Sequence, residues 1–543
     1  MSKLGSAERG LGLACVVTLA GTFGAGETQA QEMLSAWTNQ RSGSAAEDDL
    51  FGAHVARLGD INADGIIDFF ISAIDEDNDV APYDHCCFGT GRVVSGADGA
   101  ILRKHLGPEE AGFYGMSIAA GSDLDGDQIA DYAISSPYLP NVMTGPSEGV
   151  VDVYSGATGA LLFQLTGERD GDAFGAMTRF VGDVDADGVD DLGVGAPWID
   201  GGRNLPQVGG VYIHSGRTGA VLYKVTGTKA NEFMGKVNGL GDINGDGHAD
   251  FAIGSNGFNA GPNTEGKVGV YSGATGAKLY TLVGEDPGDK FGDNLCPLGD
   301  VNGDGAPDFA VNSPVHGLVG RIYVYSAPTG KLLYTIDGVY TQQQFGYLPA
   351  RGPTDFNGDG FDDVIVGTIY VATYPNNESK IQIHDGRTGR LVHEIWGESL
   401  PSGFTEGLVQ SDACGDFDGD GIDDIIAGAA DWNASDGRAY VFAGNDLFLQ
   451  VRPTDAAVGD IVTADLRGGP PGLLGLLALV DVSGTPTFET LLLAPFDSHG
   501  EMQLSAQMPP SASGLDFTVI GYSQNRAGRG PLMDSLRVTV TVK

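Results

Sequence analysis

An acidic segment of nine residues recurs seven times along the chain, and this repetition constrains the fold more than any other feature of the sequence. The copies are DINADGIID (60–68), DLDGDQIAD (123–131), DVDADGVDD (183–191), DINGDGHAD (242–250), DVNGDGAPD (300–308), DFNGDGFDD (355–363) and DFDGDGIDD (416–424). Successive copies begin about 59 residues apart. A fixed period of this kind is typical of a repeat architecture, in which each repeat contributes one structural unit.

Each acidic segment, numbered here as loops 1 to 7, is flanked by other sequence motifs at nearly constant distances. An FG pair or a close relative precedes it, and a short apolar segment ending in small residues follows it. Two apolar segments around an ATG- or RTG-type turn complete the repeat, as in GKVGVYSGATGAKLYTLVGE (266–285). The FG pairs are Phe51-Gly52, Phe174-Gly175, Phe291-Gly292 and Phe345-Gly346, with Phe113 in FYG and Phe233 in FMG.

These patterns predict four strands per repeat and no helix. Segments rich in Val, Ile, Leu and Tyr favour strands, and the glycine of the turn supplies the positive φ that a tight hairpin needs. We name the strands A, before the acidic loop, then B, C and D. Seven four-stranded units predict an all-β, seven-bladed β-propeller. The last repeat loses the turn pattern after residue 443, and residues 33–39 resemble a strand D, so we expect them to complete the last blade.

The combination of an FG pair, an acidic loop and a GAP tripeptide (195–197) resembles the FG-GAP repeat of integrin α-subunit propellers and their secreted bacterial relatives. The resemblance covers residues 33–446, about three quarters of the chain. It implies a seven-bladed propeller. It also implies that ligands bind on the face opposite those loops.

The acidic loops carry the chemistry that the sequence reveals most clearly. Positions 1, 3, 5 and 9 of each loop hold Asp or Asn, and such hard oxygen ligands, converging in a tight loop, suit Ca²⁺. The carbonyl of position 7 is the expected further ligand, and glycine at position 6 allows the sharp turn, except for Gln128 in loop 2. Position 12 is apolar in all seven copies, which excludes an EF-hand. Mg²⁺ is disfavoured because it prefers to keep its waters.

The predicted ligands, up to seven Ca²⁺ in all, are Asp60, Asn62, Asp64, Ile66 and Asp68; Asp123, Asp125, Asp127, Ile129 and Asp131; Asp183, Asp185, Asp187, Val189 and Asp191; Asp242, Asn244, Asp246, His248 and Asp250; Asp300, Asn302, Asp304, Ala306 and Asp308; Asp355, Asn357, Asp359, Phe361 and Asp363; and Asp416, Asp418, Asp420, Ile422 and Asp424.

The charge balance favours metal binding and argues against nucleic acids and anionic lipids as partners. The chain has 72 Asp and Glu against 30 Lys and Arg, a net charge of −42, and 24 of the acids are predicted ligands. Such a surface repels nucleic acids and anionic lipids. Crowded carboxylates repel one another without a counter-ion, so we expect the metal-free protein to be less stable.

The opposite face of the predicted propeller carries B–C loops of variable length, and variable loops on a rigid scaffold are where recognition usually occurs. We call it the B–C face. Its aromatic residues are the predicted ligand-binding residues, although rings of this kind also pack on neighbouring loops: Tyr83, Tyr138, Trp198, Phe258, Tyr374 and Trp432.

The chain divides into three predicted parts. Residues 1–30 have a basic start, an apolar stretch and small residues before a cleavage point, as in a secretory signal peptide. Residues 31–446 form the propeller. Residues 447–543 show alternating segments that predict a small β-sandwich. No later stretch reaches the roughly 18–20 apolar residues of a membrane span. Cys86 and Cys87 are adjacent, and either a vicinal disulfide or free thiols fit the sequence.

Three functions fit these features. The first is a secreted or cell-surface adhesion or recognition module that binds extracellular proteins without catalysis. The second is a lectin, because aromatic rims suit sugars. The third is a calcium-dependent polysaccharide lyase, although the scattered histidines form no catalytic motif. His214 and His384 fall at a strand position held by tyrosine in other repeats. The acidic cluster of Asp75, Glu76, Asp77 and Asp79 is interpreted as a solvated loop.

Overall fold

The computed structural model describes residues 33–542 apart from 39–49, 77–87, 108–111, 138–147, 203–204, 258–265, 339–342, 350–353, 358–359, 371–378, 398–406, 420–421, 431–436, 445–447, 453–454, 457–460, 468–473, 483–484, 496–501, 508–515, 524–532 and 535–537. The predicted signal peptide and the Cys86–Cys87 pair lie outside the described residues, so both remain predictions.

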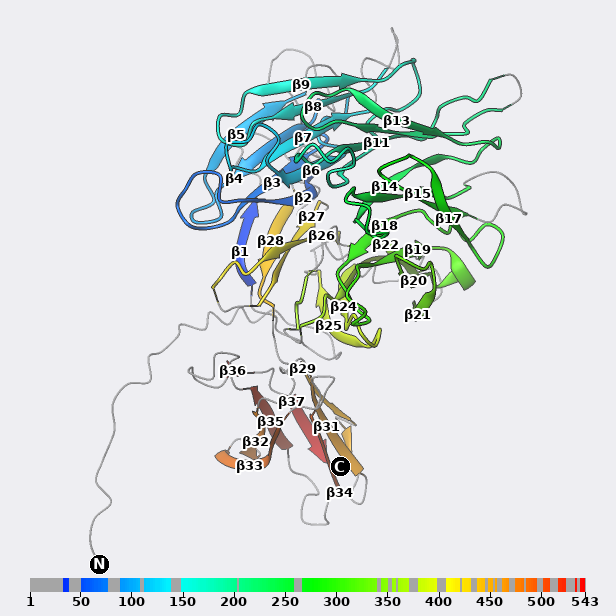
Figure 1. Ribbon diagram of the computed structural model, residues 1–543. Coiled ribbons are helices and arrows are strands. Elements are labelled where there is room, and N and C mark those ends of the chain that lie inside the picture. Colours follow the sequence, from blue (N-terminus) through cyan, green and yellow to red (C-terminus); the bar gives the residue numbers. More distant parts are fainter. Residues whose placement is uncertain are drawn as a thin grey trace, which may run out of the picture. The chain divides into compact units, whose positions relative to one another are not determined.

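Seven four-stranded antiparallel sheets follow one another along the chain (Figure 1). Blades 1 to 3 consist of β2 (Phe51–Gly59), β3 (Asp68–Ala73), β4 (Thr90–Val94) and β5 (Ile101–Leu106); β6 (Ile118–Ser122), β7 (Asp131–Ser136), β8 (Val150–Tyr154) and β9 (Leu161–Thr166); and β10 (Met177–Phe180), β11 (Leu192–Ala196), β12 (Gly210–His214) and β13 (Val221–Thr226). Blades 4 and 5 consist of β14 (Met234–Gly241), β15 (Asp250–Ser255), β16 (Lys267–Tyr271) and β17 (Lys278–Val283); and β18 (Leu295–Leu298), β19 (Asp308–Ser313), the short 3₁₀ helix η1 (His316–Leu318), β20 (Arg321–Ser326) and β21 (Leu332–Asp337).

Blade 6 consists of β22 (Gln343–Pro349), β23 (Val364–Tyr370), β24 (Lys380–His384) and β25 (Leu391–Trp396). Blade 7 takes β26 (Leu408–Gly415), β27 (Asp424–Ala429) and β28 (Arg438–Phe442) from the last repeat, and its outer strand is β1 (Met33–Thr38). The prediction of an all-β protein with a seven-bladed propeller is confirmed.

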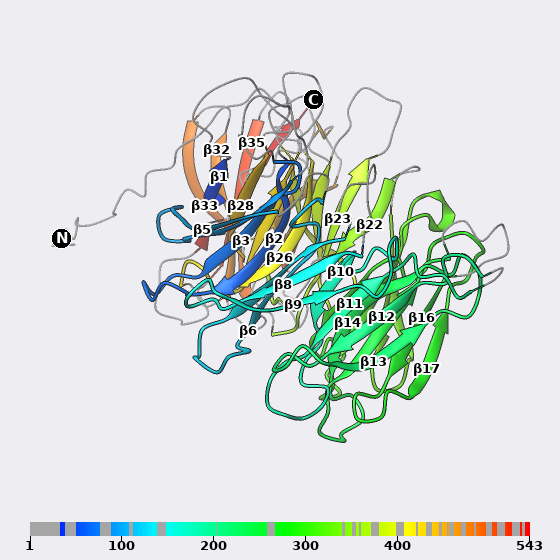
Figure 2. The same ribbon diagram turned by 90° about the horizontal axis from the view of Figure 1, so that it is seen from above.

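The first and last blades meet, which closes the ring. Strand β1 pairs antiparallel with β28, with Trp37 opposite Ala439, and Figures 1 and 2 show β1 beside β28. On the inner side, β2 of blade 1 lies next to β26 and β27 of blade 7. Outer strands of a sheet expose unpaired backbone groups, so a ring that joins both ends of the chain leaves few such edges.

The hydrophobic core lies between blades rather than inside any one of them. Strands B and C are buried almost throughout, as in the six buried residues of β3, whereas the outer strand β5 is half exposed. Among the described residues, seven apolar clusters occupy the interior, and each combines residues of two neighbouring blades. Each blade therefore depends on both neighbours for its burial, as in other repeat proteins.

The glycines of the FG pair and of the GAP-like segment allow neighbouring blades to approach closely. A Cβ added to Gly195 would collide with the carbonyl oxygen of Gly235 in the next blade, and Gly428 faces Gly52 across the closing junction in the same way. Glycine is therefore required at these boundaries because a side chain would push two backbones apart.

The structure refines the predicted FG positions in blades 2 and 4. Tyr114 and Met234, rather than Phe113 and Phe233, occupy the buried place that Phe174 fills in blade 3. Phe113 and Phe233 fall one residue earlier, where the backbone takes a positive φ of 51° and 48°.

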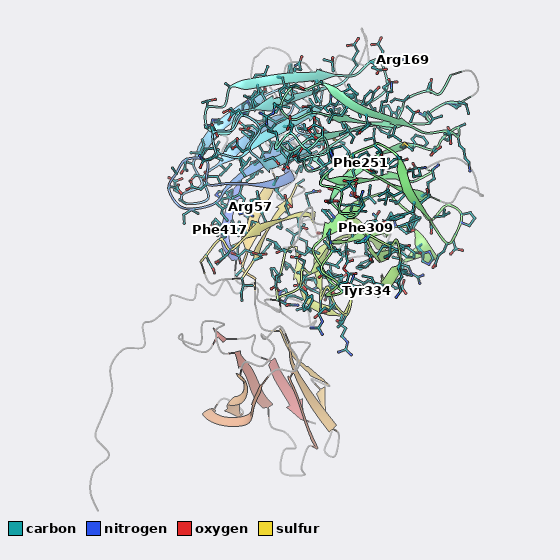
Figure 3. All side chains as sticks on the ribbon, viewed as in Figure 1. Arg57, Arg169, Phe251, Phe309, Tyr334 and Phe417 are labelled. Carbon is teal, nitrogen blue, oxygen red and sulfur yellow. The ribbon has the colours of Figure 1, made fainter. Side chains whose placement is uncertain are left out.

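A second contact joins the outer strands of blades 1 to 5, and the closing strand β1, to the C–D turn of the following blade. The Tyr334 hydroxyl, labelled in Figure 3, donates a hydrogen bond to the carbonyl oxygen of Gly386, and the ring covers Gly389. At the closing junction Trp37 covers Gly99 of blade 1. Its ring centroid lies 5.3 Å from that of Phe69, so the closing strand is anchored by aromatic packing as well as by backbone pairing.

Beyond the propeller the described strands form two further sheets. One joins β29 (Phe448–Arg452), β31 (Ile461–Arg467) and β34 (Met502–Gln507). The other joins β30 (Asp455–Ala456), β37 (Val538–Val542), β35 (Asp516–Ser523), β32 (Leu474–Val482) and β33 (Thr485–Pro495), with β36 (Met533–Asp534) paired to β35. The strands agree with an all-β second region, and its arrangement as a sandwich stays a prediction.

His384 and His214 are buried at equivalent places, at the ends of β24 and β12. The Nδ1 atom of His384 lies 3.1 Å from the carbonyl oxygen of Gly389, and that of His214 lies 3.0 Å from Gly219. A neutral ring with its proton on Nδ1 donates this hydrogen bond. Burial lowers the pKa of His384 to about 4, and it also lowers the pKa of His214.

We expect acid to destabilise the propeller partly through His384. Its folded pKa lies below the ordinary value, so between about pH 6.5 and pH 4 the unfolded chain takes up a proton that the folded chain refuses. Stability should therefore fall with pH across this window, by about 3 kcal/mol for a shift of this size. The variant His384→Tyr, with the residue used in other blades, should lose less stability between pH 7 and pH 4 in urea unfolding. Parallel pH curves for the two proteins would contradict this.

Candidate functional site

The acidic loops connect strands A and B in every blade. Position 9 is the first residue of strand B in blades 1, 2, 4, 5 and 7, and it immediately precedes that strand in blades 3 and 6. The rigid, buried strand thus fixes one end of each loop. Much of the loop is exposed, whereas its apolar position 2, such as Val184 in loop 3, is buried below it.

Position 1 organises the turn by binding backbone amides. In loop 2, Asp123 Oδ1 accepts from the amides of Gly126 and Asp127 at 2.7 and 3.2 Å, and Oδ2 accepts from Gln128 at 2.8 Å. The same pattern recurs at Asp60, Asp183, Asp242 and Asp300. Such Asx turns draw the carboxylates of a short loop toward one point.

Position 6 takes a positive φ, as the prediction for glycine requires. Gly65, Gly188 and Gly247 have φ values of 91°, 86° and 87°. Gln128 adopts the same conformation with a φ of 72°, so loop 2 keeps the turn although it lacks the glycine.

Position 9 is a buried carboxylate that ties the loop to its own blade. Asp131 accepts hydrogen bonds from the amides of Leu124 and Gly156, both at 2.7 Å, and Gly156 begins the C–D turn. Desolvation raises the pKa of Asp131, Asp191 and Asp308 to about 6, and repulsion from nearby acids such as Asp125 adds to the rise at Asp131. A nearby cation would offset this cost.

Three loops bring acid oxygens close enough to share one ion. The sets whose oxygens all lie within 4.8 Å of one another are Asp123, Asp125 and Asp127; Asp183, Asp185 and Asp191; and Asp416, Asp418 and Asp424. These all-oxygen sets of anionic donors fit a hard divalent cation. They are therefore acidic groups that could hold a metal.

For the predicted ligands that are described but lie outside these three sets, the structure gives hydrogen bonds but no close set of acid oxygens. Positions 1, 3, 5 and 9 of loops 1, 4 and 5 follow the same hydrogen-bond pattern, with Asn62, Asn244 and Asn302 each donating to the carboxylate at position 9. Asp359 and Asp420 lie outside the described residues. At position 7 the amides of Ile66, Ile129, Val189, His248 and Ala306 donate to the carboxylate at position 5, and their carbonyls stay predicted ligands.

The B–C face offers two half-exposed tryptophans. Trp198, predicted from the sequence, is 39% exposed directly after β11. Trp396, which sequence reasoning missed, is 40% exposed at the end of β25, and the Lys380 ammonium lies 4.5 Å from its ring centre. The sequence offered one indication of Trp396, because this residue ends the segment predicted as strand D of blade 6. Tyr83, Tyr138, Phe258, Tyr374 and Trp432 lie outside the described residues.

Glu76, one member of the acidic cluster of blade 1, does not lie in a solvated loop. Glu76 is fully buried, and its carboxylate contacts Arg92 and Lys104, each at 2.6 Å, and the Thr90 hydroxyl. Burial alone would raise the pKa of Glu76, but Arg92, Lys104 and Thr90 together hold it below its ordinary value. The interpretation of this residue as solvated is therefore wrong, and it joins strands C and D of the blade.

Comparisons with known proteins agree with the fold and the loops. Residues 235–271 and 409–442 match the FG-GAP repeat family. The chain is 31% identical over 219 residues to integrin alpha-PS2 of Drosophila melanogaster, which is 36% of this chain and 15% of that protein. It is 30% identical over 220 residues to integrin alpha-V of Gallus gallus, which is 37% of this chain and 21% of that protein.

The matched region thus spans about a fifth or less of these relatives. A solved structure described as "Structure of Dos1 propeller" aligns with a TM-score of 0.41 and 10% identity, over 70% of this chain and 77% of that one. The predicted likeness to FG-GAP repeats and integrin α subunits is confirmed. Among the described residues, no helix is both long and apolar enough to cross a bilayer.

Proposed function

We propose that this FG-GAP propeller is a calcium-loaded recognition module that works outside the cell and binds a protein or another cell-surface ligand on its B–C face. The convergence of acid oxygens in the loops is the observation that carries the proposal. The similarity to integrin α subunits supports an adhesive role rather than a catalytic one.

Calcium fits these loops better than other common ions. The predicted ligands are carboxylate, amide and carbonyl oxygens, and the loops offer several of them at once, whereas Mg²⁺ usually keeps most of its waters. Each ion would be held by positions 1, 3, 5 and 9 and the carbonyl of position 7. When bound, it would supply positive charge where the chain has collected 24 of its 72 acids.

The role of the metal is structural in this proposal. Position 9 accepts from the amide that follows strand C in loops 1 to 4, 6 and 7, as with Asp191 and Gly216 at 2.9 Å. An ion at the loop would therefore brace two neighbouring connections of the blade. It would bind the folded chain and not the unfolded one, which stabilises the fold.

The opposite face is the surface left for a ligand. Trp198 and Trp396 come from blades 3 and 6 and present amphipathic rings, which favour both protein and sugar partners. A glycan ligand is the second candidate because exposed rings suit stacking on sugars.

We infer that no catalytic step is involved. The described residues include a close pair of titratable side chains with altered pKa values, His105 and Tyr132, whose hydroxyl lies 2.7 Å from His105 Nε2. Burial lowers the pKa of His105 to about 4 and raises that of Tyr132, and both belong to the packed junction of blades 1 and 2. A lyase would instead show turnover of a polysaccharide.

The test is a binding screen of residues 31–543, loaded with calcium, against extracellular proteins and glycans. We expect saturable binding that falls at least tenfold in Trp198→Ala or Trp396→Ala, with the melting temperature nearly unchanged. Lys331→Ala, a change at an exposed residue of a C–D turn on the other face, serves as the surface control. Competition by monosaccharides would favour the lectin, and product release from a polysaccharide would overturn the non-catalytic proposal.

A further inference from the structure

In loop 3 an arginine side chain reaches one of the predicted metal ligands. Arg217 lies in the turn between β12 and β13. Its Nε donates to Asp187 Oδ2 at 2.9 Å, and its Nη2 donates to the Asp187 carbonyl oxygen at 2.8 Å. Two hydrogen bonds from one planar guanidinium fix the position of this acid.

Asp187 occupies position 5, and its counterparts use their oxygens differently. In loops 1 to 5, Oδ1 of this residue accepts from the amide of position 7, as in Asp127 with Ile129 at 2.8 Å and Asp187 with Val189 at 3.0 Å. Oδ2 is the oxygen left to face an ion. In loop 3 that oxygen is the one that Arg217 holds.

Loops 2 and 3 also differ in which acid oxygens lie close together. Loops 2 and 3 carry the same four aspartates at positions 1, 3, 5 and 9. In loop 2 the close set includes position 5, Asp127. In loop 3 the close set consists of Asp183, Asp185 and Asp191 and leaves Asp187 out.

In blades 1, 2, 4, 5 and 6, the residue at the position of Arg217 does not place a cation on the acidic loop. The residue equivalent to Arg217 is Ala157 in blade 2, and it is Ala or Pro in blades 1, 4 and 5. Blade 6 has Arg387, but its guanidinium carbon lies 4.8 Å from the centre of the Phe361 ring. The chain therefore contains a matched acidic loop without the cation and a matched arginine directed elsewhere.

We propose that Arg217 is a tethered cation that competes with the metal ion for Asp187, so that loop 3 binds calcium more weakly than loop 2. This rests on the proposed function, since it assumes that the loops bind metal. Before Asp187 can complete the site, the guanidinium must leave Oδ2, and its positive charge also opposes an incoming divalent ion. Without metal, the same contact partly neutralises the four aspartates.

The effect is moderate because the pair is open to solvent. The side chains of Arg217 and Asp187 are 53% and 28% exposed. Exposed ion pairs are weak, and charge repulsion between them and an ion is screened by water, so a change of about three- to tenfold in one site's affinity is expected.

Calorimetric calcium titration of the chelator-treated protein provides the test, with the number of ions retained at each free calcium level counted by native mass spectrometry. Arg217→Ala should strengthen one site about three- to tenfold. Ala157→Arg should weaken one site by a similar factor, and Arg387→Ala should change none. In a background of Asp183→Asn, which disables loop 3, the effect of Arg217→Ala should vanish.

A second readout needs no metal. In chelator, Arg217→Ala should melt at a lower temperature than the wild type, because the four acids lose their counter-charge. If calcium binds but Arg217→Ala leaves every site unchanged or weakens one, the inference about Arg217 is overturned while the proposed function stands. If the wild type binds no calcium at all, the proposed function is overturned and the inference with it.

Discussion

Removing divalent metal with a chelator should lower the melting temperature of the propeller by about 10 °C or more. One site at a hundredfold excess over its dissociation constant stabilises a fold by about 2.7 kcal/mol, so several sites together reach on the order of 10 kcal/mol. For about 400 residues, with an unfolding entropy of about 2.1 cal/mol/K each, this corresponds to about 10 °C. Differential scanning calorimetry at constant ionic strength measures the shift.

The controls separate binding from charge screening. Adding back calcium should restore the melting temperature, and equimolar magnesium should restore much less of it. High sodium chloride should recover only part of the loss, because salt screens repulsion between exposed acids but does not coordinate them. If the chelated protein melts at the same temperature as the calcium-loaded one, the loops do not hold the scaffold.

Replacing Trp37 by alanine should cost about 3–5 kcal/mol of unfolding free energy, the range for deleting a large buried aromatic side chain. Trp37 is 7% exposed and lies in a core cluster that joins blade 7 to blade 1. It packs on Phe69 and covers Gly99 of blade 1, while its own strand pairs with β28. The loss therefore falls on the junction that closes the ring.

The matched control is Trp396→Ala, which removes the same side chain from a place where it is 40% exposed. It should cost about 1 kcal/mol or less, including the contact with Lys380. Urea unfolding followed by far-UV circular dichroism measures both. Equal losses in the two variants would contradict a special role for the closing strand.

The features that the sequence predicts well are local and repeated. Seven acidic loops at a regular spacing determine the number of blades, and the alternating segments around each turn identify the strands. The closing strand at residues 33–39 is a long-range feature, but it too is predictable, because the last repeat lacks a fourth strand and the early segment matches one. A single repeat would not reveal these features, and the comparison of seven repeats does.

The features that the sequence misses depend on contacts between distant segments. Tyr114 and Phe113 are adjacent aromatic residues, and only the junction with blade 1 decides which of them is buried. Glu76 follows an acidic neighbour in the sequence, yet Arg92 and Lys104 from later strands enclose it. Arg217 and Asp187 are 30 residues apart, so their pairing emerges only when the loop and the turn meet at one end of the blade.

The central claim is that the acidic loops bind calcium and thereby stabilise the propeller. The most direct test is the calcium content of residues 31–543, measured by inductively coupled plasma mass spectrometry after dialysis against micromolar free calcium. We predict several ions per chain, up to one for each of the seven loops, and fewer when Asp123→Asn and Asp183→Asn are combined. A folded protein that retains no calcium under these conditions would contradict the account.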